Sequence, residues 1–181
     1  MRPIRLLTQR GSERLMRNAI EEEFDAAEFL DGAKGAVREV MARYGEKDWE
    51  ALEGMVSKRM LLGMKEEHDN LLEQRQLKVV NISTDIQEAS LQLPCVWGRR
   101  SIKEYDEERA RAPLISGAAP FWNVIFVNVI SRVRVRLADA HSGRMATNAT
   151  SRQGVFVFAR GPLPRQVVPE VHPPWWMVGW L

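Results

Sequence analysis

The residues best suited to chemistry in this chain are three arginines that alternate with valines: Arg132, Arg134 and Arg136. In an extended strand, alternate residues project from the same face, so the three guanidiniums would span roughly 13 Å at about 3.3 Å per residue. Arginine forks bind phosphate oxygens in pairs, which predicts a contact for phosphates or anionic lipid headgroups. The alternative is pairing with a carboxylate on a neighbouring strand, such as Asp85 or Glu88, or plain solvation.

The three histidines, His68, His141 and His172, are the other candidates for site chemistry. They fall in different predicted elements, and none has the H-x-x-x-H or H-E-x-x-H spacing of a zinc site. Ser142 follows His141 but lacks the motif of a nucleophile elbow. We therefore expect no metal, no cofactor and no catalytic residue, and the chain is predicted not to be an enzyme.

Two tryptophans suggest a surface for another protein. Trp97 and Trp122 flank a charged segment, 98–120. If both side chains are exposed together, they would mark a protein interface, because aromatic anchors are typical binding hot spots.

Charge is unevenly distributed along the chain. Residues 1–20 hold five arginines and Glu13, a net charge of +4, so the overall +2 leaves about −2 for the rest. Such a body lacks the basic field of a dedicated nucleic-acid binder. Segment 1–20 is typical of a mitochondrial targeting segment or a retained basic tail. With 181 residues, of which 45% are hydrophobic, the chain fits one domain, predicted to occupy residues 21–181.

Membrane anchoring and disulfide bonding are both disfavoured. Cys95 is the only cysteine, so no disulfide can form within the chain, and a reducing compartment fits best. No run of about 18 apolar residues exists for a transmembrane helix, so any membrane contact would be peripheral.

Hydrophobic spacing predicts helices in the first half of the chain. The first helix is expected from Ala26 to Arg43 with Asp25 as its N-cap, and Gly45 is predicted to stop it. A second helix is expected after Asp48, and a third extends toward residue 76.

The second half changes to a period near two, which predicts roughly four long antiparallel strands. A turn is expected around Ser142 and Gly143. The sequence thus predicts an α+β fold in which a curved sheet wraps over three helices. The expected strand segments are "LKVVNISTDIQEASLQLPCVW", "FWNVIFVNVISRVRVRLADA", "RQGVFVFAR" and "WWMVGWL".

One stretch of the helical half is similar in sequence to a known domain: "FDAAEFLDGAKGAVREVMARYGEKDWEALEGMVSKRMLLGMKEE". It resembles the opening of the domain named after subunit forty-four of the mitochondrial inner-membrane translocase, closest to the branch that interacts with the matrix AAA peptidase. A mitochondrial large-subunit ribosomal protein of the same family is more distantly similar. Downstream, "VFVFARG" and "PPWWMV" look like the last two strands of that family, whereas 98–120 departs from its pattern as an insertion.

The resemblance implies a cone of the nuclear-transport-factor-two-like class on the matrix side of the inner membrane. We therefore expect a non-catalytic accessory subunit or assembly adaptor of a complex at that membrane, and the candidate hosts are a respiratory-chain complex, the ATP synthase, the mitochondrial ribosome and the AAA peptidase. Anionic lipid and ribosomal RNA remain as further contacts. Because the same cone houses isomerases and dehydratases, a small cavity enzyme is the alternative, with Asp85, Tyr44 and His68 as the residues to test.

The resemblance also bears on the tryptophan-rich end of the chain. If "WWMVGWL" is the last strand of the sheet, one alternating set of its side chains faces the helices. We therefore expect the terminal tryptophans to belong to the core and not to a membrane anchor.

Overall fold

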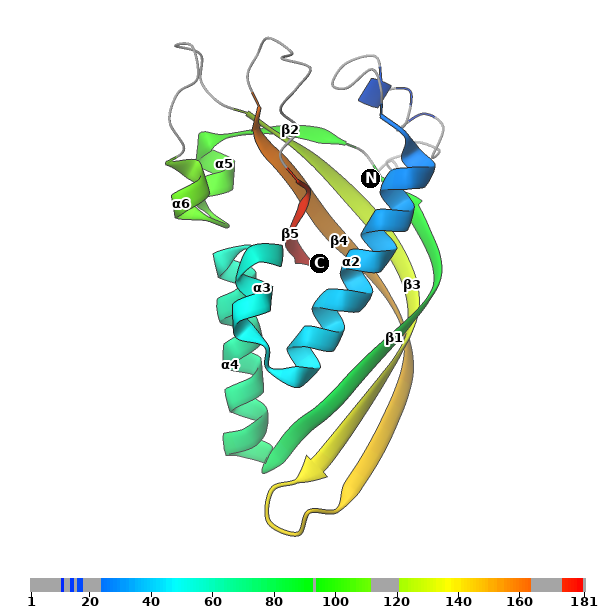
Figure 1. Cartoon of the computed structure of the whole chain (residues 1–181), viewed down its shortest axis with the longest axis vertical. Helices are drawn as coiled ribbons and strands as arrows, with labels where there is room; N and C mark the ends of the chain where they lie inside the picture. The colour runs from blue at the N-terminus through cyan, green and yellow to red at the C-terminus, as the bar shows by residue number, and fades with distance from the viewer. Residues whose placement is uncertain are drawn as a thin grey trace, which may run out of the picture.

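The computed structural model describes residues 24–92, 94–111, 121–163 and 174–180, together with Gly11, Arg14, Met16 and Arg17. Helices precede a mostly long-stranded sheet, which confirms the predicted α+β class (Figure 1). The elements, in order, are α2 (Ala26–Glu46), α3 (Trp49–Met55), α4 (Lys58–Arg75), β1 (Leu77–Leu91), β2 (Cys95–Gly98), α5 (Arg99–Lys103), α6 (Glu107–Ala110), β3 (Phe121–Asp139), β4 (Met145–Leu163) and β5 (Trp176–Trp180).

The sheet is antiparallel, with the strand order β1-β3-β4-β5 and the short β2 paired to β3 beyond the end of β1. It curves around α2, α3 and α4, and the β3–β4 hairpin extends below them (Figure 1). The sequence predicted roughly four strands; β2 is the additional one.

A side-chain cap begins each of the helices α2, α3 and α4. The Asp25 carboxylate accepts hydrogen bonds from the backbone N–H groups of Ala27 and Glu28, as predicted for an N-cap. Asp48 caps α3 in the same way. Ser57 caps α4 through its hydroxyl oxygen, a cap that the hydrophobic spacing did not predict.

The predicted stop at Gly45 is wrong. Helix α2 continues to Glu46 and ends at Lys47, which has φ 60°. Gly45 is instead a packing residue, because a Cβ atom there would lie 2.7 Å from the backbone nitrogen of Ile82. A missing side chain is needed for α2 to approach β1 this closely.

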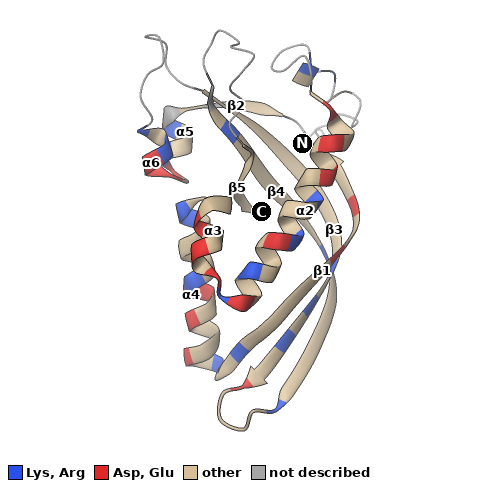
Figure 2. Ribbon diagram, in the orientation of Figure 1, with Lys and Arg blue, Asp and Glu red and all other residues tan. Residues whose placement is uncertain are grey.

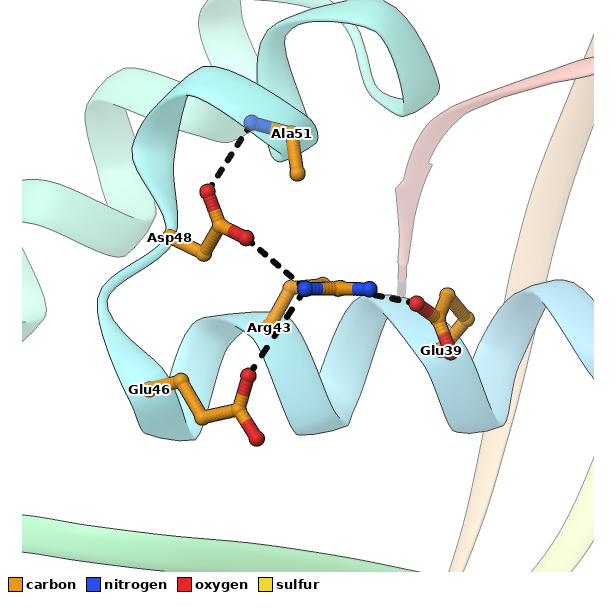
Figure 3. Close-up of polar contacts among 5 residues, drawn as sticks. All are labelled: Glu39, Arg43, Glu46, Asp48 and Ala51. Carbon is orange, nitrogen blue, oxygen red and sulfur yellow. Dashed lines mark hydrogen bonds and ion pairs between the residues drawn. The ribbon is translucent and has the colours of Figure 1, made fainter.

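Arg43 joins the first two helices at their corner (Figure 3). Its guanidinium lies 2.7 Å from Glu39 and 2.9 Å from Asp48, and Glu46 is 3.9 Å away. Asp48 simultaneously accepts from the N–H of Ala51, so one carboxylate caps α3 and holds it to α2. The hydrogen bond that Arg43 donates to Glu39, followed by the negative charge of Glu39, raises the pKa of Arg43.

The larger core lies between the helices and the concave face of the sheet. Apolar residues spaced along α2 and α4 meet alternate residues of β1 and β3. The most deeply buried members include Met16, Val37, Val40, Leu52, Val56, Met64, Ile125, Val127, Val129 and Met177.

A second, smaller core lies on the opposite side of the sheet, under α5 and α6. Trp122 and Trp176 are buried there with Ile102, Val124 and Val178, and the guanidinium of Arg109 lies 4.0 Å from the centre of the Trp176 ring. Trp176, Met177 and Val178 are all 2% exposed or less. Trp176 is therefore a core residue, whereas Trp175 is half-buried and Trp180 is 39% exposed.

Ser57 ties the last strand to the helices. Its backbone N–H donates to the carbonyl of Met177 at 2.8 Å, and its hydroxyl donates to the carbonyl of Val178 at 2.7 Å. Since Ser57 is 0% exposed, both bonds are shielded from water.

Candidate docking surface and cavity

The β3–β4 hairpin ends in the predicted turn. Asp139 accepts from the backbone N–H groups of His141 and Ser142, and Gly143 has φ 69°. Strand β4 starts at Met145, well before the segment that the sequence predicted as a strand. The missed part, "MATNATS", lacks apolar alternation because helices do not cover it.

Arg132, Arg134 and Arg136 project together from β3 in this lower half, on the face opposite the helices, and all three are exposed. Figure 2 shows basic residues spaced along the lower strands. Directly opposite Arg134 lie Ser83 on β1 and Ala149 on β4. None of these three arginines takes part in an ion pair among the described residues.

One acidic residue does lie beside the row. Asp85 of β1 is directly opposite Arg132, the geometry of a cross-strand charge pair, although the two groups are not within 4.0 Å. The partners of Arg136 are Asn81 and Thr147. Two of the three guanidiniums, those of Arg134 and Arg136, thus have uncharged cross-strand neighbours.

The concave face of the same half forms a cavity of about 470 Å³. Its walls are mostly apolar, from α2, α4 and all the strands except β2. The charged groups that line it are Glu67, Arg75 and Arg152. The other lining residues are Met41, Tyr44, Leu71, Val79, Ile82, Ser131, Val133, Val135, Leu137, Asn148, Thr150, Gln153, Gly154, Phe156 and Trp180.

Tyr44 contributes a polar group to this cavity. Its hydroxyl has no hydrogen-bond partner among the described residues. Burial, followed by the charge of nearby Glu67 and its interaction with the phenol, raises the pKa of Tyr44, so the phenol stays protonated near neutral pH. The cavity therefore combines the Tyr44 phenol, one carboxylate and two guanidiniums with walls that are mostly apolar.

Of the three residues named for a cavity enzyme, Tyr44 and His68 pack against each other, whereas Asp85 lies apart from both. Of these, only Tyr44 lines the cavity; Asp85 is exposed on the other face of the sheet. His68 is 1% exposed and packs edge-on against Tyr44 and Trp49, with ring centres 6.2 Å and 5.9 Å away. Desolvation, with a smaller contribution from Lys47, lowers the pKa of His68, so it is neutral in the folded protein.

A protein interface was predicted only if Trp97 and Trp122 were exposed together, and this is not the case. Trp122 is 0% exposed in the second core, so it offers no surface to a partner. The side chain of Trp97 lies outside what the structure describes. Within the charged segment, α5 and α6 fold over Trp122, and Lys58 of α4 pairs with Glu108 of α6 at 2.6 Å.

Neither a metal cluster nor a membrane-crossing helix is found in the described residues. No group of three or more His, Cys, Asp or Glu side chains in them converges on one point. None of the described helices is both long and apolar enough to cross a bilayer. His141 lies at the hairpin turn, and His172 lies outside the described residues.

Sequence alternation was sufficient to find the arginine row, but Glu67, Arg75 and Arg152 were missed. Their positions depend on how α4 crosses the sheet, which spacing along one element does not give. For Arg152, the length of β3 was a usable signal. A long hairpin strand pairs with an equally long strand after the turn at Gly143, which places Arg152 on β4.

Comparison with known families identifies one domain. The family model of the Tim44-like domain matches residues 14–93. The match covers α2, α3, α4 and β1, and it confirms the family resemblance of the helical half; the later strands lie outside it. No curated protein matches the chain. The Tim44-like family is mitochondrial and associated with the inner membrane, where its domain has a protein-interaction role.

Proposed function

We propose that this chain, whose residues 14–93 match the Tim44-like domain, is a non-catalytic accessory subunit or assembly adaptor on the matrix side of the mitochondrial inner membrane. The family supports a role in protein interaction, and the structure supplies a surface for it. The observation that carries the proposal is the lower half of the hairpin, where residues 141–153 are all exposed. A strand such as β4, which is exposed over this length at the edge of the sheet, is well placed to bind a neighbour.

The candidate hosts are a respiratory-chain complex, the ATP synthase and the mitochondrial ribosome. Co-migration tests this assignment: isolated mitochondria are separated on a native gel, and the slices are analysed by mass spectrometry. We expect the chain in a band far larger than its own 20.7 kDa. Recovery only near that mass would contradict a subunit role.

Within this role, Arg132, Arg134 and Arg136 are proposed as the contact for phosphates or anionic lipid headgroups. Flotation with vesicles of phosphatidylcholine and cardiolipin, at low and high salt, tests it. Binding should weaken with salt and be lost on replacing all three arginines by alanine, because exposed charges are screened. Equal flotation of the triple variant and the wild type would remove this part of the proposal.

A cavity enzyme is the second candidate, since Tyr44 and Glu67 line one cavity. A phenol held protonated beside a carboxylate is an arrangement that can donate and accept a proton. A Glu67→Gln variant that retains every host interaction while losing turnover of a carbonyl substrate would favour this candidate. Absence of turnover in the wild type across a panel of small carbonyl compounds would count against it.

A further inference from the structure

The sheet has one edge that lacks a partner strand. β5 pairs with β4 only at residues 156–159, so residues 145–155 of β4 have β3 on one side and no described strand on the other. Backbone N–H and C=O groups along such an edge are free to pair with another extended chain.

This edge is also regular. The β3–β4 register runs without a shift from Asn123 to Ala138, and residues 145–155 contain neither proline nor lysine. The opposite edge differs: β1 has register shifts at Val80 and Gln87, and it carries Lys78, Asp85 and Glu88. Bulges and charges are the devices by which proteins protect an edge from pairing, and the free part of β4 has almost none of them.

We propose that the free edge of β4 binds an extended segment of a partner protein as an added strand, whose side chains alternate between apolar and acidic. The proposal rests on the anionic contact assigned to the arginine row and names its partner. The added strand would continue the line of β5 down the edge of the sheet.

The outward side chains of the added strand would meet the arginine row. Arg134 and Arg136 are on β3, two strand positions, or about 9.6 Å, from the added strand. The β4 residues between them on this face are small: Thr147, Ala149 and Ser151. Arginine and glutamate side chains can therefore meet over β4, which favours acidic residues at the outward positions.

The inward side chains would cover the mouth of the concave cavity. There the sheet presents Phe156 and the 39% exposed Trp180, which stack edge-on at 6.5 Å, and α4 presents Leu71. Exposed apolar walls with an aromatic anchor favour apolar inward residues. Arg75 and Arg152 at the same cavity would tolerate one acidic residue among them.

Charge argues against two other occupants. Segment 1–20 of this chain has a net charge of +4 and would be repelled by the row. A second copy paired through β4 would place two arginine rows on one continuous sheet face. The added positive charge on one face disfavours such a pair at low ionic strength, whereas an acidic partner is attracted to the row, so an acidic partner fits better than either.

The test uses the full-length protein and a labelled peptide, as long as the free edge, in which valine and glutamate alternate. NMR hydrogen exchange gives the decisive readout. Alternate residues of an edge strand direct their N–H groups outward, so roughly every second amide in 145–155 should exchange quickly in the free protein and become protected by the peptide. A valine–lysine peptide should give no protection.

Two pairs of variants sharpen the experiment. Arg134→Ala/Arg136→Ala should weaken the glutamate peptide about fivefold or more, whereas Arg38→Ala/Arg100→Ala, which removes the same charge from exposed sites elsewhere, should leave it unchanged. Proline lacks a backbone N–H, so an edge strand tolerates it only where that N–H points away from the sheet. Of Ala149→Pro and Thr150→Pro, the variant that keeps the wild-type melting temperature has therefore lost an outward N–H. This variant should bind the glutamate peptide less tightly.

The outcomes separate the two proposals. Peptide binding with protected β4 amides supports the added strand. Cardiolipin vesicle binding that depends on the arginines, without peptide binding or amide protection, overturns the added strand and leaves the anionic contact standing. Absence of both peptide and vesicle binding overturns both. Protection of β1 amides in place of β4 amides also overturns the added strand.

Discussion

The two halves of the β3–β4 hairpin have the same backbone but different surroundings. In the upper half, helices cover the concave face and α5 and α6 cover the other, so Trp122 and Phe158 are both buried. In the lower half, residues 141–153 are exposed and the outer face carries an arginine row. The upper half is therefore covered on both faces, whereas the lower half leaves the outer face and most of β4 exposed.

The largest effect is expected in the upper half, from Trp122→Ala. Removing a fully buried indole should lower the free energy of unfolding by about 3–5 kcal/mol, because the cavity cannot collapse well. Urea denaturation followed by circular dichroism measures it. Thr147→Ala in the lower half should stay within about 0.5 kcal/mol of the wild type, and equal losses in the two variants would break the comparison.

Ser57→Ala should have the next largest effect. It removes the cap of α4 and leaves the buried carbonyl of Val178 without its donor, a loss of about 2–3 kcal/mol. Thermal unfolding measures the change, with Ser83→Ala on the exposed sheet face as the matched control. A Ser57→Ala protein as stable as the control would show that β5 does not depend on this link.

His68 gives a smaller, pH-dependent effect. The folded protein holds His68 neutral by lowering its pKa, whereas the unfolded chain takes up a proton below about pH 6.5. Stability should therefore fall as pH decreases from about 7 toward 5, by at most about 1.4 kcal/mol per pH unit. His68→Leu should flatten the profile of unfolding free energy; an unchanged slope would place the cause elsewhere.

The smallest stability effect is expected from Arg134→Ala/Arg136→Ala. Both side chains are exposed and neither forms an ion pair among the described residues, so the free energy of unfolding should change by no more than about 0.5 kcal/mol per site. The same denaturation experiment measures it. A large loss would mean that the arginines stabilise the fold and are not held free for a ligand.

The sequence predicted those elements that pack one face against the core along their whole length. Residues 26–43 and the odd positions of β3 alternate with the period of their element, because each packs one face on the core. Asp25 and Asp48 were also predicted correctly, since a cap depends only on the next three residues.

Long-range packing decided the rest. Gly45 looked like a helix stop, but its role depends on Ile82, far along the chain. Trp122 was considered as an interface anchor because nothing local shows that α5 and α6 fold over it. The family match covers 14–93 and so leaves the arginine row unassigned. Alternation along one strand was enough to predict the arginine row, whereas the cavity beside it depends on how the helices cross the sheet.

We propose that the lower half of the hairpin, and not the covered half, contacts a protein partner in mitochondria. Site-specific photo-crosslinking tests it directly, with a photoreactive residue at Thr147 in the lower half or at Val96, which is 52% exposed on β2. We predict a crosslink from position 147 to one protein subunit of a large inner-membrane complex, and none to that subunit from position 96. Crosslinks from position 96 alone, or from position 147 to lipid alone, would contradict the claim.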